Sequence, residues 1–206
     1  MHTPSALRLH KAAEADFPTR FGHFRIYGFE GRGEDRLEEA VVLEMGDVAH
    51  GVLSPLVRIH SQCLTGDVFH SLRCDCRAQL ELALHMIAEE GRGLLIYEHQ
   101  EGRGIGLLNK LRAYELQDEG ADTVEANERL GFESDLRHYE LPGEILRYFG
   151  LKSVRLLSNN PEKVTAVEAA GVRVAERVPC IVPAMLSTEA YLRTKKEKMG
   201  HLLEGF

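Results

Sequence analysis

Three cysteines within fourteen residues are the part of this chain with the clearest chemistry. Cys63, Cys74 and Cys76 have the spacing C-x10-C-x-C. In an extended segment, Cys74 and Cys76 point to the same face and can share an ion. Three thiolates suit a zinc ion whose fourth position is left for water, as in catalytic sites. The spacing alone also allows three buried thiols without metal, or a structural zinc whose fourth ligand is His60, His70 or Cys180.

Three other segments offer cations and backbone donors to an anionic ligand. They are RIHSQ (58–62), EGRGIG (101–106) and SNNPEK (158–163). The glycines of the second segment allow close approach to the backbone, and the N-terminus of a following helix favours anions. Lys163 falls in a first helical turn, where a bound anion would offset its unfavourable position in the helix dipole. Taken singly, the second segment can also be a tight turn and Lys163 a solvated surface lysine.

Asp135-Leu136-Arg137 is a further candidate, because in an extended segment both charged side chains face one way. They could serve as a base and a phosphate contact. The alternative is a surface ion pair worth at most about 1 kcal/mol. Cys180 is expected only to pack, and histidines 2, 10, 23, 50, 85 and 201 are expected to be surface or core residues.

Alternating strands and helices are expected to position these residues. Short apolar runs up to about residue 57 indicate strands, with a hairpin or loop at 31–36. Later segments alternate: helix 80–88 ending at Gly91, strand 93–98, helix 107–114 ending at Gly120, strand 154–158, helix 160–170, strand 172–178 and helix 188–203. The pattern predicts a layered α/β/α fold with a mixed sheet, an N-terminal β-rich segment and a zinc-binding loop.

Composition limits the function classes. The chain has 206 residues, with 25 Lys and Arg against 32 Asp and Glu, a net charge of −7. This balance argues against general nucleic-acid binding, which needs a basic face. No stretch approaches the roughly 20 apolar residues of a membrane span, and the N-terminus does not match a secretory signal, so we expect a cytoplasmic protein. A reducing cytoplasm disfavours disulfides, so the cysteines require another explanation.

Several long runs closely resemble GTP cyclohydrolase II: RIHSQCLTGDVFHSLRCDCRAQL (58–80), residues 97–139, SNNPEK (158–163) and TKKEKMGHLL (194–203). The resemblance extends from about residue 17 to the C-terminus, which divides the chain into an extension (1–16) and one catalytic domain (17–206). It implies opening of the GTP imidazole ring with release of formate and pyrophosphate. The product would be 2,5-diamino-6-hydroxy-4-(5-phosphoribosylamino)pyrimidine, in the first step of riboflavin biosynthesis. It also implies one zinc per subunit, magnesium with the triphosphate, and a homodimer.

The resemblance assigns roles to individual residues. Cys63, Cys74 and Cys76 match the zinc ligands, Asp135 a proton acceptor, and Tyr114 a tyrosine beside the substrate. Arg137 matches a proposed nucleophile toward the α-phosphorus. Because a guanidinium is protonated at neutral pH, we prefer a bidentate phosphate clamp for Arg137. The residues that match GTP contacts are Arg58, Ile59, His60, Ser61, Gln62, Gln79, Glu101, Gly102, Arg103, Thr123, Ser158 and Lys163.

Three positions depart from the pattern of this family. Gln62 stands where glutamate is frequent, Arg77 where glycine is frequent, and Ser158 where threonine is usual. None removes a cysteine ligand or the Asp135–Arg137 pair. Two rival functions remain: an enzyme of the same fold that keeps the formyl group or uses another purine nucleotide, and a nucleotide-binding regulator with a structural zinc.

Overall fold

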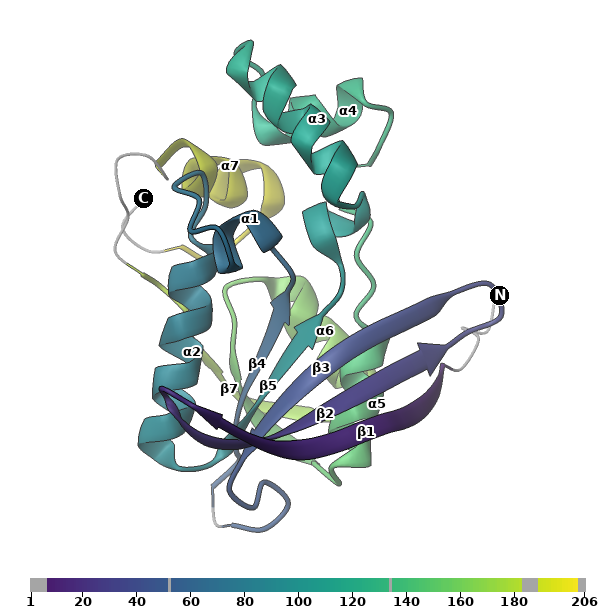
Figure 1. Ribbon diagram of the computed structural model, residues 1–206, viewed down its shortest axis with the longest axis vertical. Coiled ribbons are helices and arrows are strands. Elements are labelled where there is room, and N and C mark those ends of the chain that lie inside the picture. The colour runs from purple at the N-terminus through teal and green to yellow at the C-terminus, as the bar shows by residue number, and fades with distance from the viewer. Residues whose placement is uncertain (1–6, 52, 134, 183–188, 204–206) are drawn as a thin grey trace.

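A seven-stranded mixed sheet forms the centre of the computed structural model, which describes residues 7–51, 53–133, 135–182 and 189–203 (Figure 1). Its strands are ordered β1-β2-β3-β5-β4-β6-β7. Their bounds are β1 Arg8–Thr19, β2 Gly22–Arg32, β3 Leu37–Met45, β4 Leu56–Ser61, β5 Gly93–Glu98, β6 Ser153–Leu157 and β7 Arg173–Val178. The predicted mixed sheet with a β-rich N-terminal segment is confirmed.

Antiparallel and parallel pairing divide the sheet in two. β1, β2, β3 and β5 pair antiparallel in that order, whereas β5, β4, β6 and β7 pair parallel. The hairpin predicted at residues 31–36 joins β2 to β3, and the Gly33 amide donates to the Arg36 carbonyl at 3.0 Å. β1 crosses the predicted boundary between residues 16 and 17, so the N-terminal extension contributes to the sheet.

The helices are α1 Leu64–Asp67, α2 Cys76–Glu90, α3 Leu107–Asp118, α4 Thr123–Arg129, α5 Glu140–Tyr148, α6 Pro161–Ala169 and α7 Glu189–Met199, with a 3-10 turn η1 at Glu101–Gly104. The predicted helices correspond to α2, α3, α6 and α7, whereas α1, α4 and α5 were not predicted. Asn160 caps α6 as expected, accepting from the Glu162 amide at 3.0 Å. The predicted last helix ends at Met199 instead of Leu203, and Thr188 lies outside the described residues.

Each face of the sheet packs against its own helices. Val57 and Ile59 of β4 face the cluster formed with α5 and α6, whereas Leu56 faces α2. The same alternation holds in β5, because successive side chains of a strand point to opposite faces. Cys180 is fully buried on the α2 side, so the prediction that it packs is confirmed. The two faces give the layered α/β/α arrangement.

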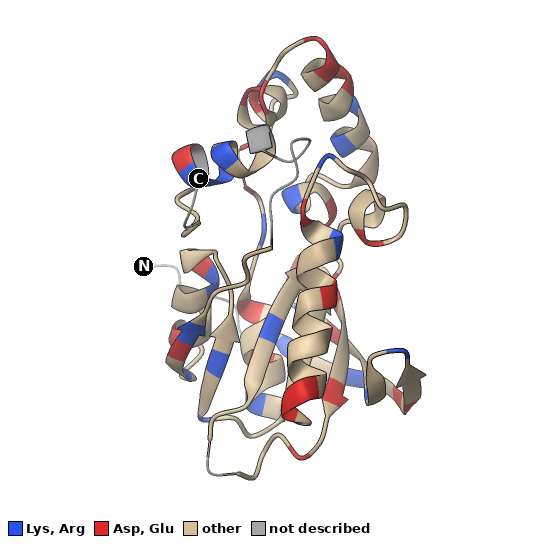
Figure 2. Cartoon of the chain, turned by 90° about the vertical axis from the view of Figure 1, so that its left-hand side faces the viewer, with Lys and Arg blue, Asp and Glu red and all other residues tan. Residues whose placement is uncertain are grey.

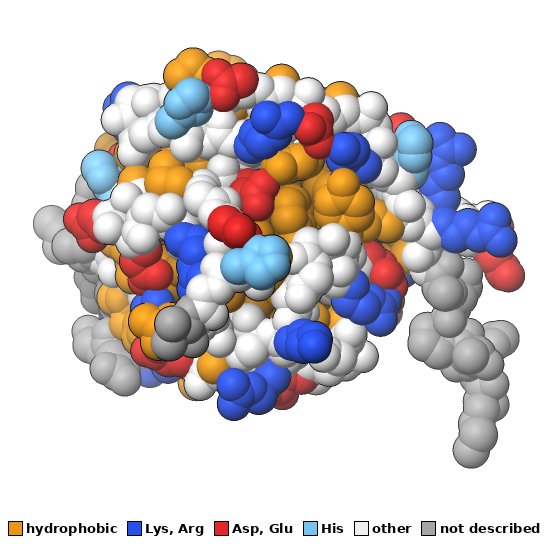
Figure 3. Space-filling view, turned by 90° about the horizontal axis from the view of Figure 1, so that it is seen from below, with side chains coloured by type: hydrophobic (Ala, Val, Ile, Leu, Met, Phe, Trp, Pro, Cys, Tyr) orange, Lys and Arg blue, Asp and Glu red, His pale blue; other side chains and the backbone are white. Residues whose placement is uncertain are grey.

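The carboxyl ends of β4 and β5 lie at the same edge of the sheet, because the two strands are parallel neighbours. α1, α3, α4 and α7 stand over this edge, as two perpendicular views show (Figures 1 and 2). At the opposite end of the molecule, basic and acidic side chains are interspersed with apolar ones (Figure 3). No helix within the described ranges is long and apolar enough to cross a membrane.

Candidate active site

The three predicted metal ligands come together at the edge where β4 ends. Cys63 follows β4, Cys76 begins α2, and the ligand atoms of the three cysteines all lie within 4.8 Å of one another. The sulfurs of Cys63 and Cys74 are 3.7 Å apart. A tetrahedral zinc with Zn–S bonds of about 2.3 Å would place two sulfurs about 3.8 Å apart. The cluster therefore has the dimensions of a zinc site.

A glycine makes room for this cluster. A Cβ added to Gly66 of α1 would lie 2.9 Å from the Cys74 sulfur and 3.2 Å from the Cys63 sulfur. A carbon atom normally stays about 3.5 Å or more from such neighbours. The thiols therefore converge over a surface that only glycine leaves free.

Within the described residues, no His, Asp or Glu joins the three thiols as a fourth ligand. The Nε2 atom of His60 faces the Asp67 carboxylate, and the Cys180 thiol donates to the carbonyl of Gln79. His70 is exposed. The predicted alternative of a zinc site closed by one of these residues is not what the described part of the chain forms.

Lys110 of α3 gives the cluster a cationic neighbour. Its Nζ lies 3.2 Å from the Cys63 sulfur and 2.7 Å from Glu101 Oε1. Hydrogen bonds from the Cys74 and Cys76 thiols, followed by the charge of Lys110, hold the pKa of Cys63 well below its ordinary value. The site therefore favours a thiolate, the form that binds metal ions.

Asp67 fixes the backbone of Cys63. Its buried carboxylate accepts a hydrogen bond from the Cys63 amide at 3.0 Å and from the Tyr97 hydroxyl at 2.8 Å. It also lies 3.2 Å from Nε2 of His60, whose ring stacks on Tyr97. Burial lowers the pKa of His60, so its imidazole is neutral. The position of the Cys63 thiol is thus fixed by residues of β4, β5 and α1 together.

Arg77, which stands where glycine is frequent in the family, has a structural role at the start of α2. Its guanidinium donates to the carbonyl of Asp67 at 2.6 Å and to the carboxylate of Glu81 at 2.9 Å. It therefore ties the end of α1 to α2 beside the thiols. The departure at this position adds a contact and removes no ligand.

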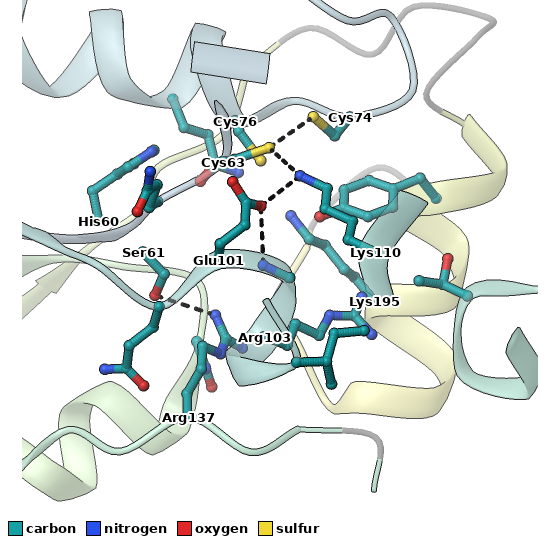
Figure 4. A pocket seen from close by; sticks show the side chains of 18 of the residues that line it. His60, Ser61, Cys63, Cys74, Cys76, Glu101, Arg103, Lys110, Arg137 and Lys195 are labelled. Atoms are coloured by element: carbon teal, nitrogen blue, oxygen red, sulfur yellow. Dashed lines mark hydrogen bonds and ion pairs between the residues drawn. The ribbon is translucent and has the colours of Figure 1, made fainter. Parts of the chain in front are cut away.

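A cavity extends from the thiols (Figure 4). Glu101 is the only carboxylate among the described residues that line it. Its cationic lining residues are Arg58, Arg73, Arg103, Lys110, Arg137, Lys163 and Lys195. This concentration of positive charge suits a polyanionic ligand, and it is local, because the whole chain carries a net charge of −7.

Most of the predicted substrate contacts line this cavity. They are Arg58, His60, Ser61, Gln62, Gln79, Glu101, Gly102, Arg103, Thr123, Ser158 and Lys163, together with Tyr114 and Arg137. Ile59 does not, since its side chain is buried in the sheet core and its carbonyl accepts from Lys163 Nζ at 2.9 Å. Asp135 is not a lining residue, but it accepts a hydrogen bond from Arg137, which is one.

Asp135 and Arg137 form a largely buried ion pair. The Nε atom of Arg137 donates to Asp135 Oδ1 at 2.8 Å, and a second guanidinium nitrogen donates to Oδ2. The side chains are only 16% and 11% exposed, so the alternative of an ordinary surface pair does not hold. Burial opposes both charges, but the mutual hydrogen bonds keep the pKa of Asp135 below, and that of Arg137 above, its ordinary value.

Lys163 and Glu98 are buried beside this pair. Lys163 Nζ lies 3.3 Å from the Ser61 hydroxyl, which donates to Glu98 at 3.4 Å. Burial is the main cause of both pKa shifts: it lowers the pKa of Lys163 to about 7 and raises that of Glu98 to about 7. Charging Lys163 at this end of the cavity therefore costs free energy that an anionic ligand would reduce.

Arg103 presents a guanidinium toward the cavity from a strained turn. Its φ is +60°, a left-handed conformation that is rare for residues other than glycine. Its two terminal nitrogens are buried and have no hydrogen-bond partner within the described residues. Such strain and unpaired donors are typical of functional sites.

Sequence patterns did not identify several residues that contact these groups: Asp67, Glu98, Lys110, Lys195 and His201. His201, expected to be a surface or core residue, lines the cavity. Lys110 could have been found, because it lies four positions before Tyr114 and both therefore share one helix face. The others depend on tertiary contacts that leave no local pattern.

The fold and the site are those of an α/β enzyme with a candidate thiolate metal centre facing a cavity lined with cations. The GTP cyclohydrolase II family model matches residues 10–179, and the chain belongs to this family.

Several known proteins are identical to this chain at about half of the aligned positions. GTP cyclohydrolase-2 of Escherichia coli O9:H4 (strain HS) is 53% identical over 96% of this chain and 99% of its own length. GTP cyclohydrolase-2 of Haemophilus influenzae (strain PittGG) is 50% identical over 95% and 90%. The riboflavin biosynthesis protein RibBA of Bacillus subtilis (strain 168) is 51% identical over 94% of this chain, which spans only 48% of that relative.

Proposed function

We propose that this chain hydrolytically opens the imidazole ring of GTP, releasing formate and pyrophosphate. The product is 2,5-diamino-6-hydroxy-4-(5-phosphoribosylamino)pyrimidine, and the reaction is the first step of riboflavin biosynthesis. One observation carries the proposal: three convergent thiols lie at one end of a cavity lined with cations. Family membership supplies the substrate class, and the local cations explain how a chain of net charge −7 binds a triphosphate.

Cys63, Cys74 and Cys76 would hold one zinc ion per subunit. Bound zinc would supply a water of lowered pKa for hydrolysis of the purine ring. Three thiolates leave the site with a net charge of −1, which weakens this effect compared with a site of neutral ligands. Lys110 partly compensates, because its ammonium group lies 3.2 Å from the Cys63 sulfur. Tyr114, whose hydroxyl lies 3.1 Å from that of Thr65, borders the space beside the cluster.

Asp135 and Arg137 divide the work of proton transfer and phosphate binding. Asp135 is ionised in the ion pair and can accept a proton once Arg137 engages the substrate. Arg137 keeps its proton, because its hydrogen bonds with Asp135 outweigh the effect of burial on its pKa. We therefore assign Arg137 to a bidentate phosphate clamp, rather than to nucleophilic attack.

Arg103 and Lys163 would bind the triphosphate together with Arg137. Arg103 offers unpaired guanidinium donors, and Lys163 becomes more readily charged beside an anion. Magnesium would accompany the triphosphate, as is usual for its binding through substrate phosphates. Arg58 acts indirectly, because its guanidinium is held by the Leu157 carbonyl and the Gln79 side chain at 2.9 and 2.7 Å.

We also propose the cellular setting expected from the resemblance. The catalytic domain comprises residues 17–206, the active form is a homodimer, and the protein is cytoplasmic. The acidic balance of the chain supports the absence of a nucleic-acid partner. No membrane partner is expected.

The direct test is incubation of zinc-loaded protein with GTP and magnesium. Formate and pyrophosphate are each quantified, and the pyrimidine is identified by mass. Equal amounts of both with the deformylated pyrimidine support the proposal. Pyrophosphate with a formylated product supports the sibling enzyme that retains the formyl group. Neither product, from folded protein that binds GTP, supports a regulatory role instead.

A further inference from the structure

The chain after α7 returns into the nucleotide cavity. Leu202 donates its amide to the Asn159 carbonyl at 2.9 Å, beside Ser158, and the His201 amide donates to the Lys195 carbonyl at 3.1 Å. Leu203 is buried. These contacts hold residues 201–203 against the segment that follows β6. The side chain of His201 is thereby placed in the cavity wall.

A buried ion pair fixes α7 relative to the thiols. Lys195 Nζ lies 2.9 Å from Asp75 Oδ1, and the side chains are 12% and 4% exposed. Asp75 stands between Cys74 and Cys76 in the sequence and directly precedes α2, without a side-chain capping hydrogen bond. Figure 4 shows Lys195 on the same side of the cavity as Lys110. α7 and residues 201–203 that follow it are therefore positioned by the segment that carries Cys74 and Cys76.

His201 faces cations and keeps one ring nitrogen unused. Its Nε2 atom is buried and has no hydrogen-bond partner in the described part of the chain. Burial, followed by the charges of Lys195, Arg137, Arg103 and Lys163, lowers the pKa of His201 to about 3. The imidazole is therefore neutral at physiological pH. Unpaired buried polar atoms are uncommon in folded proteins, and a bound ligand is one reason for them.

The identity of the ligand follows from its neighbours. Arg103 also has buried, unpaired donors in the same cavity, and the charged groups that shift the pKa of His201 most are all cations. A ligand that satisfies all of these groups must present several anionic acceptor oxygens. A neutral imidazole can donate one hydrogen bond from Nε2–H to such an oxygen.

We propose that His201 is a nucleotide-binding residue that donates from Nε2 to a phosphate oxygen of the same polyphosphate that Arg103 binds. This inference rests on the proposed function for the identity of the nucleotide. It assigns the C-terminal segment a direct part in substrate binding, in addition to its packing against the metal-binding loop.

The test compares His201→Leu, which removes the donor, with His201→Gln, whose amide can replace Nε2–H. Calorimetric titration of zinc-loaded protein with guanosine 5′-(α,β-methylene)triphosphate and magnesium gives the dissociation constant without pyrophosphate release. A second titration uses guanosine, which has no phosphate. His50→Leu is the matched control, because His50 is exposed and does not line the cavity.

We expect His201→Leu to weaken binding of the analogue about tenfold. His201→Gln should restore most of the affinity, and neither variant should change guanosine binding or zinc content. Unchanged affinity of His201→Leu for the analogue would overturn the inference, as would an equal loss for guanosine.

A measurement on the unmodified protein covers the case in which His201→Leu does not fold. The ¹⁵N resonance of His201 Nε2, identified by its absence from His201→Gln, should move when the analogue is added. A resonance that stays in place would contradict the contact. If the unmodified protein gives no formate from GTP but passes these tests, the proposed function fails and the phosphate contact stands.

Discussion

Replacing Gly66 with alanine is expected to impair the metal site while leaving the fold intact. The added Cβ would lie 2.9 Å from the Cys74 sulfur, 3.2 Å from the Cys63 sulfur and 3.2 Å from Cys76 Cβ. Relief of these contacts requires at least one sulfur to move by about half an ångström. Zinc–ligand distances tolerate only about 0.2 Å.

We therefore expect Gly66→Ala to lower zinc affinity about 10- to 100-fold, the range typical of changes next to metal ligands. This corresponds to about 1.4 to 2.8 kcal/mol of binding free energy. Alanine is intrinsically favoured over glycine in a helix by about 0.5–1 kcal/mol, which offsets part of the strain in zinc-free protein.

Competition with a chromogenic zinc chelator measures this effect. Gly28→Ala is the control, because a Cβ at Gly28 meets nothing within 4 Å. Equal zinc affinity in Gly66→Ala, Gly28→Ala and unmodified protein would refute the argument that the thiols converge on a shared ion.

Three further predictions address the rest of the site. Asp135→Asn should retain zinc but lose formate release, measured against the exposed control Asp16→Asn; full activity would exclude the proton-acceptor role. Glu98→Gln should raise the melting temperature of ligand-free protein at pH 8 and hardly change it at pH 5. The reason is that a folded-state pKa of about 7, above the ordinary 4.5, is associated with stability that is lost as pH rises toward 7; an equal effect at both pH values would contradict this. Lys195→Met should lower the free energy of unfolding by about 3 kcal/mol, because it leaves the Asp75 carboxylate buried without its partner. Adding Asp75→Asn should recover part of that loss in urea denaturation, and additive losses would refute the coupling.

Local patterns predicted much of the fold. Gly91 adopts the left-handed conformation that ends α2, and Asn160 with Pro161 starts α6, because these signals act within a few residues. α5 was missed, although Leu141, Ile145 and Leu146 have helical spacing and are buried. Pro142 and Gly143 obscured this pattern, since both residues usually interrupt helices.

The site was predictable where chemistry requires a fixed residue type. The cysteine spacing indicated the candidate metal ligands without knowledge of the fold. The buried state of the Asp135–Arg137 pair was not predictable, because it depends on residues of β4 and β5 that lie beside it. Nor was the place of His201, which is set by a hydrogen bond between Leu202 and Asn159 across the fold. Long-range contacts of this kind leave no periodic signal in the sequence.

The most direct test of the account is formate release from GTP as zinc is added back to metal-free protein. The rate should rise in proportion to bound zinc and reach a plateau at one zinc per chain, with equal pyrophosphate. Full formate release without zinc, or one tightly bound zinc without any formate, would contradict the claim that the three thiols form a catalytic centre.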